Sequence, residues 1–221
     1  MMETGIYCGD YFELMRDMKD GSIDLTIMPP PNGTEFRLIA RELLRITANG
    51  GIVILVISDD AAIQVDVSIR KVSILKEIGF DLLNTVSHTT SVTQHHLTYT
   101  EVSHSAFIFS KGEPRISRNK KLKQWKGDVE TFDTPEDEDE VATECRVGLP
   151  EKLVEALILT WSNPYDLIFA LECGTGNVCK VAKINNRRYL GIDTSEEHCS
   201  IARAILETRG PQQASLSLQE D

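Results

Sequence analysis

A glycine turn followed by an acidic residue is the first feature that could bind a ligand. The segment Asp166-Leu-Ile-Phe-Ala-Leu-Glu-Cys-Gly-Thr-Gly176 is an apolar strand pattern that ends in Gly174 and Gly176. Glycines at the carboxyl end of a parallel strand let a ligand approach the backbone, and an acidic residue ending the next strand can accept both hydroxyls of a ribose. Asp193 ends that next strand pattern, close to the interval of ~20 residues typical of dinucleotide-binding units. The pattern favours a nucleoside-binding edge, and the alternative is an ordinary strand-to-helix turn.

Three consecutive prolines after a strand pattern form the second such feature. The segment Asp24-Leu-Thr-Ile-Met-Pro-Pro-Pro-Asn-Gly33 runs into Pro29, Pro30 and Pro31. Proline fixes an extended backbone and cannot donate ladder hydrogen bonds, so the strand must end there. In an open α/β sheet this is the edge at which ligands bind, and the alternative is a stiff surface loop.

Opposite charges are separated into two neighbouring blocks. Residues 111–126 contain seven basic side chains, including Lys120, Lys121 and Lys123, and residues 128–144 contain nine acidic ones. Such blocks are typical of solvated loops and can pair with each other. The alternative is that the basic block forms a nucleic-acid-binding patch.

The composition indicates a globular chain that is acidic overall. The 221 residues are 41% hydrophobic, which is enough for one domain with a buried core. Lys+Arg 23 against Asp+Glu 34 gives a net charge of −11, which argues against a general nucleic-acid binder. The longest apolar run, Ile52–Ile57, is far shorter than the ~20 residues of a membrane-spanning helix, so we expect no membrane association.

The N-terminus and the cysteines favour a cytoplasmic protein. Glu3 and Asp10 stand where a signal peptide would carry basic residues. Five cysteines at scattered positions show no paired spacing, so we expect reduced thiols. The four histidines from His88 to His104 lack cysteine or carboxylate partners at metal-binding spacing, and we expect no metal site.

The elements that must position these residues begin in α/β order. A strand at Ser22–Ile27 precedes a helix with apolar residues from Phe36 to Ile46, capped by Thr34 and ended by Asn49-Gly50-Gly51. The next expected elements are a strand at 52–57, a helix at 61–78, and edge strands at 80–86, 98–102 and 105–109. This order predicts a parallel sheet with crossover helices and an antiparallel edge.

The last third of the chain returns to α/β order. The expected elements are a helix from Pro150 to Trp161, strands at 166–171 and 188–192, a helix at 177–184, and a last helix through Ile205. Thr194 and Glu197 have the spacing of a capping box that opens this last helix. The composition after Gly210 is that of a flexible tail.

Together, these segments resemble the DNA amino-methyltransferases that use S-adenosylmethionine (SAM), in the permuted order with the catalytic motif before the cofactor glycines. The resemblance covers nearly the whole chain and rests on several weak motifs in the right order. They are Tyr7-Cys-Gly-Asp10, Met15–Lys19, Gly21-Ser-Ile-Asp-Leu25, Pro29-Pro30, His104–Gly112, Pro150–Ile158, Asn163-Pro164, the glycine turn and Arg187–Asp193. The resemblance implies a Rossmann-like methyltransferase fold, with a mostly parallel sheet, helices on both faces and an antiparallel edge.

The resemblance also implies roles for the matching residues. Gly174 and Gly176 would line the methionine part of SAM, Asp193 would hold the ribose hydroxyls, and Asp10 would lie near the adenine. The family's catalytic motif is a polar residue, two prolines and an aromatic residue, and it acts on a base flipped out of double-stranded DNA. The polar side chain and a proline carbonyl accept hydrogen bonds from the base amino group, while the aromatic ring stacks on the base.

The sequence departs from the family in the catalytic motif. Met28 replaces the polar residue and Pro31 the aromatic one, so only Pro29 and Pro30 match. Losing a charge-stabilising partner costs about 3–4 kcal/mol, and losing base stacking costs about 1–3 kcal/mol. Together these losses correspond to a rate lower by a factor on the order of 10³–10⁵.

The cofactor motifs are altered as well. Ala170-Leu171-Glu172 replaces the family's Asp-Pro-Phe. The segment Cys145-Arg-Val-Gly-Leu-Pro150 keeps only the proline of the motif that contacts the SAM carboxylate in the family. Glu172 would repel that carboxylate, or turn instead to the sulfonium or to solvent.

We therefore expect a DNA methyltransferase, as in restriction-modification systems, that modifies the exocyclic amino group of adenine or cytosine with impaired activity. The alternative is an inactive module that binds DNA or a protein partner, such as a second copy or an active methyltransferase. Residues 1–209 are predicted to form one domain, in which residues 111–149 are a short charged insertion in the place of the target-recognition region. Residues 210–221 are predicted to form a flexible tail.

Overall fold

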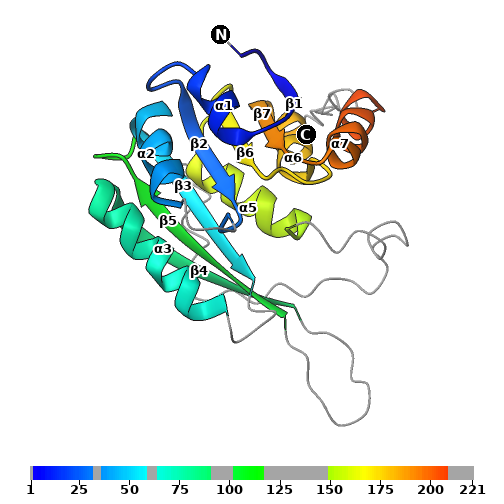
Figure 1. The fold of residues 1–221 in the computed structure, drawn as a ribbon. Coiled ribbons are helices and arrows are strands. Elements are labelled where there is room, and N and C mark those ends of the chain that lie inside the picture. The colour runs from blue at the N-terminus through cyan, green and yellow to red at the C-terminus, as the bar shows by residue number, and fades with distance from the viewer. Residues whose placement is uncertain (1, 32–35, 59–63, 91–101, 117–148, 209–221) are drawn as a thin grey trace, which may run out of the picture.

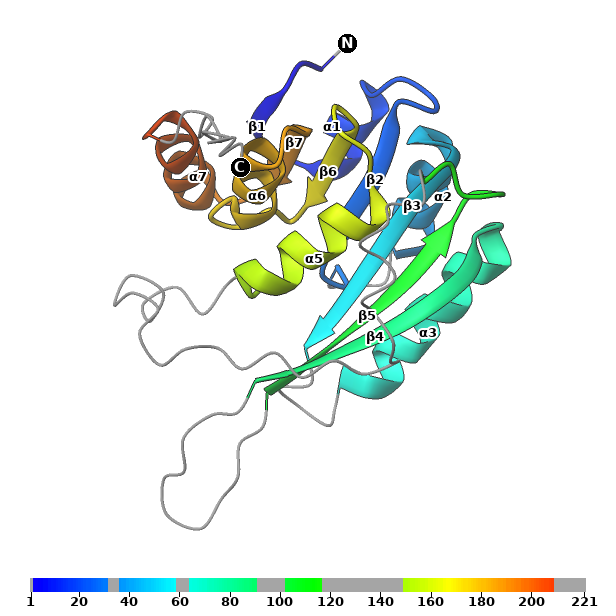
Figure 2. The same ribbon diagram turned by 180° about the vertical axis from the view of Figure 1, so that it is seen from behind.

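The computed structural model describes residues 2–31, 36–58, 64–90, 102–116 and 149–208. In these ranges strands and helices alternate along most of the chain (Figures 1 and 2). In chain order the elements are β1 Gly5–Cys8, α1 Tyr11–Arg16, β2 Ile23–Met28, α2 Phe36–Ile46, β3 Thr47–Ser58, α3 Gln64–Ile78, β4 Asp81–Thr90, β5 Val102–Ser110, α5 Glu151–Trp161, β6 Leu167–Leu171, α6 Asn177–Ile184, β7 Arg188–Asp193 and α7 Glu196–Thr208.

The strands form one mixed sheet of seven strands in the order β1-β7-β6-β2-β3-β5-β4. Five adjacent strands run parallel to one another, namely β1, β7, β6, β2 and β3. β5 pairs antiparallel with both β3 and β4. The α/β fold with a mostly parallel sheet and an antiparallel edge, predicted from the sequence, is therefore confirmed.

Helices cover both faces of this sheet, as the two opposite views show (Figures 1 and 2). One hydrophobic cluster joins the sheet to α1, α2 and α3 through Met15, Leu43 and Leu75. A second cluster joins the other face to α5, α6 and α7, with Leu157 and Ala202 among its buried residues. A parallel sheet buried on both faces explains why its central strands are continuous apolar runs rather than alternating ones.

The predicted end of α2 differs from the structure. Asn49-Gly50-Gly51 does not terminate the helix, because α2 passes directly into β3 at Ile46–Thr47 and the glycines lie inside the strand. From the pair Ile23↔Thr47 to the pair Leu25↔Ile52, β2 advances two residues and β3 five. The three extra residues of β3 form a bulge, which is a common role for glycine in a strand.

This bulge receives the chain that follows β5. The N–H of Gly50 donates to the carbonyl of Lys111 at 2.7 Å, and the N–H of Arg115 donates to the carbonyl of Gly50 at 3.1 Å. A Cβ on Gly50 would lie 2.5 Å from the carbonyl oxygen of Glu113. Position 50 therefore requires glycine because two backbones approach closely there, and not because a helix ends there, as the sequence pattern suggests.

The predicted boundaries in the last third agree closely with the structure. α5 begins after Pro150, and α6 has its predicted bounds. The cap of α7 differs, because the hydroxyl of Ser195, rather than that of Thr194, accepts a hydrogen bond from the N–H of His198 at 3.3 Å. The Thr34 cap, most of the 98–102 strand, the main part of the charged insertion and the tail after residue 209 lie outside the described residues.

Three further expectations concern side chains and helix length. Cys8, Cys173, Cys179 and Cys199 are free thiols, as predicted. Within the described ranges, no group of three or more His, Cys, Asp and Glu side chains is arranged to hold a metal ion. None of the described helices is long and apolar enough to cross a membrane.

Candidate active site

The carboxyl ends of four neighbouring strands bring together the residues predicted to bind a cofactor and a base. β1 leads to Asp10, β7 ends at Asp193, β6 leads to Glu172 and the glycine turn, and β2 leads into Met28–Pro31. These strands are parallel and adjacent in the order β1-β7-β6-β2, so their carboxyl ends share one edge of the sheet. Lys120, Lys121 and Lys123, predicted to contact DNA, lie outside the described residues.

The carboxylate of Asp193 ties the glycine turn to the start of α7. Its Oδ2 accepts a hydrogen bond from the N–H of Gly174 at 2.8 Å, and its Oδ1 accepts one from the N–H of Ser195 at 2.9 Å. Nδ1 of His198 lies 3.3 Å from the same Oδ1. The residue is only 7% exposed. Backbone N–H groups therefore fix both oxygens of this acidic side chain.

The turn after β6 is held in a left-handed backbone conformation at three positions. Glu172, Gly174 and Gly176 all have positive φ angles, of 54°, 53° and 86°. A Cβ on Gly176 would lie 2.8 Å from the Cβ of Ala202, because the first turn of α6 packs directly on α7. The backbone of the turn is thus fixed at the edge where the sequence predicts the cofactor.

Asp10 follows β1 and caps the helix α1. Its Oδ1 accepts hydrogen bonds from the N–H groups of Phe12 and Glu13 at 2.9 and 3.1 Å. The preceding N–H, that of Gly9, donates to the carbonyl of Asp193 at 3.0 Å. The exposed Asp10 is therefore held next to the end of β7, with its carboxylate shared with the first turn of α1.

The proline segment after β2 carries no polar side chain at its first position. Met28 is fully buried, at 0% exposure, in the hydrophobic cluster beneath α1, α2 and α3. Pro29 and Pro30 are half-buried and Pro31 is buried. The side chain of residue 28 thus contributes to the core, and the polar groups of this segment are backbone carbonyls.

A buried lysine, Lys71, is a functional candidate that the sequence analysis missed. Lys71 on α3 is 5% exposed, and its Nζ donates hydrogen bonds to the carbonyls of Pro30 and Pro31 at 3.2 and 2.5 Å. The same ammonium lies 5.7 Å from the ring centroid of Phe36. A sequence signal existed, because Lys71 shares a helical stripe with the apolar Leu75 and Ile78, where a charge is out of place.

Electrostatics connect Lys71 to the turn after β6. Burial lowers the pKa of Lys71, and the nearby Glu172 carboxylate opposes that shift. Burial also raises the pKa of Glu172, Asp193 raises it further, and Lys71 counteracts both effects. Glu172 is therefore electrostatically coupled to Asp193 on the cofactor side and to Lys71 on the proline side.

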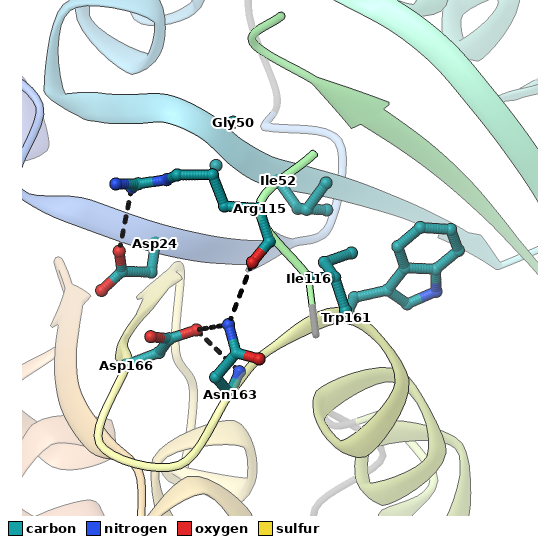
Figure 3. A pocket seen from close by; sticks show the side chains of 9 residues that line it. Asp24, Gly50, Ile52, Arg115, Ile116, Trp161, Asn163 and Asp166 are labelled. Carbon is teal, nitrogen blue, oxygen red and sulfur yellow. Dashed lines mark hydrogen bonds and ion pairs between the residues drawn. The ribbon is translucent and has the colours of Figure 1, made fainter. Parts of the chain in front are cut away.

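A pocket of about 260 Å³ lies at the opposite edge of the sheet, at the amino ends of β2, β3 and β6 (Figure 3). Nη2 of Arg115 lies 3.5 Å from Oδ1 of Asp24, and Oδ2 of Asp166 accepts a hydrogen bond from the N–H of Asn163 at 2.7 Å. Asp24 also accepts from the N–H of Leu167 at 2.9 Å. These contacts tie together chain segments at the amino edge, whereas the residues predicted to bind the cofactor and the base follow the carboxyl ends of the strands.

Comparisons with known proteins identify the family of the chain. The family described as DNA methylase matches residues 34–204, which is 171 of the 221 residues. The orphan methyltransferase M.BamHII of Bacillus amyloliquefaciens is 29% identical over 244 aligned positions, covering 88% of this chain and 92% of the relative.

Two solved structures show the same fold at low sequence identity. The cytosine-N4-specific PvuII DNA methyltransferase superposes with a TM-score of 0.76 at 17% identity, over 93% of this chain and 86% of that one. M1.HpyAVI in complex with SAM superposes with a TM-score of 0.72 at 19% identity, over 91% and 98%. The Rossmann-like methyltransferase fold and the resemblance inferred from the sequence are confirmed: the chain belongs to the DNA methylase family of amino-methyltransferases.

Proposed function

We propose that the chain is a SAM-dependent DNA amino-methyltransferase in which the cofactor edge is retained and the transfer step is impaired. Its substrate would be the exocyclic amino group of adenine or cytosine in double-stranded DNA. The proposal rests on one observation: the residue that should offer a polar group to the base, Met28, is a fully buried part of the core.

The retained edge fits SAM. Among the described residues, Gly174 alone donates to Oδ2 of Asp193, so that oxygen keeps acceptor capacity for a ribose hydroxyl. Gly174 and Gly176 would line the methionine part, and Asp10 would lie near the adenine. SAM supplies an activated methyl group on sulfur, and these residues would orient it along the edge. One solved structure of M1.HpyAVI, which has this fold, is a complex with SAM.

The impaired transfer step follows from the proline segment. The base would find no polar side chain at position 28 and no aromatic ring at position 31. Lys71 already donates to the carbonyls of Pro30 and Pro31, so those oxygens are shared with an ammonium. We expect a rate lower by a factor on the order of 10³–10⁵ than that of an enzyme with the intact motif.

Two measurements on the purified protein test this function. Isothermal titration with SAM should give a dissociation constant in the micromolar range, with one site per chain. Transfer of labelled methyl groups to mixed genomic DNA should be detectable but slow. Failure to bind SAM would overturn the cofactor assignment, and fast incorporation would overturn the interpretation of Met28 and Pro31.

The alternative function is an inactive module that serves an active methyltransferase or contacts DNA as a subunit. If no methyl transfer to DNA is detected, the buried Met28 favours this inactive module. Neutralising Lys120, Lys121 and Lys123 should then reduce both DNA affinity and its salt dependence. Low DNA affinity combined with copurification of a second methyltransferase would instead identify a protein partner.

A further inference from the structure

Lys71 brings a charge to the carboxyl end of β2, where the family motif has lost its own polar group. Its ammonium is fixed from two sides, by the carbonyls of Pro30 and Pro31 and by the face of the Phe36 ring. A lysine buried to 5% exposure is rare without an anionic partner. The carboxylate whose charge acts on Lys71 is that of Glu172.

Glu172 directly follows β6, the strand that neighbours β2. The last pair in the parallel register of β2 and β6 is Ile27↔Ala170. Two residues further along both chains, Pro29 stands level with Glu172. The left-handed backbone at Glu172, with φ of 54°, ends the strand there and turns the chain away. The backbone of Glu172 thus lies next to the start of the proline segment.

The surroundings of Glu172 suit a group that takes up a proton. Burial and the nearby Asp193 carboxylate raise its pKa, while Lys71 holds it down. A carboxylate with a raised pKa is a stronger base than an exposed one, and a neighbouring ammonium keeps it ionised near neutral pH. Glu172 is therefore placed between the cofactor residues and the proline segment, which is where the reacting amino group must lie.

We propose that Glu172 takes over the role of the missing polar residue of the catalytic motif, accepting the hydrogen bond of the base amino group, with Lys71 as its positioning residue. This inference rests on the proposed methyltransferase function, in which Glu172 is an incomplete substitute and transfer stays slower than with the intact motif. The amino nitrogen forms its bond to the methyl carbon as the bond from that carbon to sulfur breaks, and sulfur keeps the electron pair. One amino proton passes to the Glu172 carboxylate and then to water.

The first test compares Glu172→Gln with the wild-type protein and with Glu207→Gln, a control at an exposed position on α7. We expect Glu172→Gln to lower methyl transfer by about 10²- to 10³-fold, with SAM affinity within a few-fold of the wild type. Glu172→Asp should recover part of the lost rate. Wild-type rates in Glu172→Gln would overturn this inference and leave the proposed function standing, whereas a wild-type protein that binds SAM but transfers no methyl group would overturn both.

The second test concerns Lys71 and has a readout apart from activity. Because Lys71 lowers the pKa of Glu172, Lys71→Met should raise that pKa further, as followed by carbon NMR of labelled glutamate carboxyl groups. The acid limb of the methyl-transfer profile should move to higher pH in the same variant. Lys71→Arg keeps the charge and should leave both readouts near their wild-type positions. An unchanged Glu172 titration in a folded Lys71→Met protein would overturn the role of Lys71.

Discussion

The N–H of Gly174 donates a 2.8 Å hydrogen bond to Oδ2 of Asp193, 19 residues further along the chain. The glycine turn and the acidic residue are therefore one structural unit. A second oxygen of the same carboxylate accepts from the N–H of Ser195 and holds the start of α7. Asp193 thus orders both segments that would surround the cofactor.

Replacing Asp193 by Asn should weaken both the fold and cofactor binding. The amide keeps one acceptor oxygen but turns an NH₂ group toward one of the two backbone donors. Hydrogen bonds to charged groups are worth about 1.5–3 kcal/mol, so we expect the free energy of unfolding to fall by about that amount. Urea unfolding and isothermal titration with SAM would measure the two effects.

Asp166→Asn is the matched control for this change. Asp166 also accepts a hydrogen bond from a backbone N–H, but it lies at the amino edge of the sheet. We expect it to leave SAM affinity unchanged. Wild-type SAM affinity in Asp193→Asn would contradict the assignment of Asp193 to the cofactor.

Replacing Gly176 by Ala should be strongly destabilising. The new Cβ would lie 2.8 Å from that of Ala202, in a backbone conformation with φ of 86°. Left-handed strain costs about 1–3 kcal/mol, and overpacking typically costs a further 1–3 kcal/mol or so. Gly112→Ala separates the two effects, since Gly112 has φ of 74° but nothing within 4 Å of an added Cβ. Equal losses in urea unfolding would show that packing against α7 is unimportant.

Glu172→Gln should be more stable than the wild-type protein near neutral pH. The pKa of Glu172 is raised by burial and by Asp193, so the folded state binds this proton more tightly than the unfolded chain does. The contribution of Glu172 to the free energy of unfolding is therefore fully present at pH values below its pKa in the unfolded chain. It is lost as the pH rises through its pKa in the folded protein. The neutral amide removes that loss. Urea unfolding between pH 4 and 8 should show the advantage of the variant growing with pH, and a constant difference would contradict the shift.

The thiol of Cys8 should react slowly in spite of its partial exposure. A hydrogen bond to Glu196 is the main cause that raises the pKa of Cys8 to about 12, with burial contributing. At pH 8 the thiolate fraction is lower by a factor on the order of 10³ than for an ordinary cysteine. Glu196→Gln should accelerate alkylation of Cys8 by iodoacetamide, as followed by peptide mass spectrometry. Fast alkylation of native wild-type Cys8 would contradict this environment.

Local patterns predicted most of this fold and misplaced the features that depend on contacts distant in sequence. The apolar stripes and strand runs sufficed for α2, α5 and α6 because each pattern reports a single buried face. At the sheet edge, Val102 and residues 105–109 were expected in separate strands but belong to one strand, β5. The sequence pattern predicts a helix stop at Gly50, because the contact that requires glycine there is with Glu113, 63 residues further along the chain. Ser195 and Thr194 are both good caps, and only the geometry of α7 distinguishes them.

For the candidate site too, sequence motifs predicted some residues, and contacts distant in sequence were needed to find the others. The resemblance selected Asp10, Asp193 and the glycine turn, and the strand order places their segments on one edge. Lys71 lies on a helix that carries no family motif, so only its contacts with Pro30 and Pro31 reveal it. Its electrostatic influence on Glu172 depends on how α3 and β6 are placed in the fold, which the sequence does not specify.

The pairing of β1 with β7 has a consequence for biosynthesis. Gly5–Cys8 is synthesised well before its only neighbour among the described strands, Arg188–Asp193, which follows more than 170 residues later. At ~5–20 residues per second, the first strand waits many seconds for its partner. The edge that carries Asp10 and Asp193 is therefore completed only after Arg188–Asp193 has been made, and a chain interrupted before that point would display an unpaired strand for chaperones or proteases to capture.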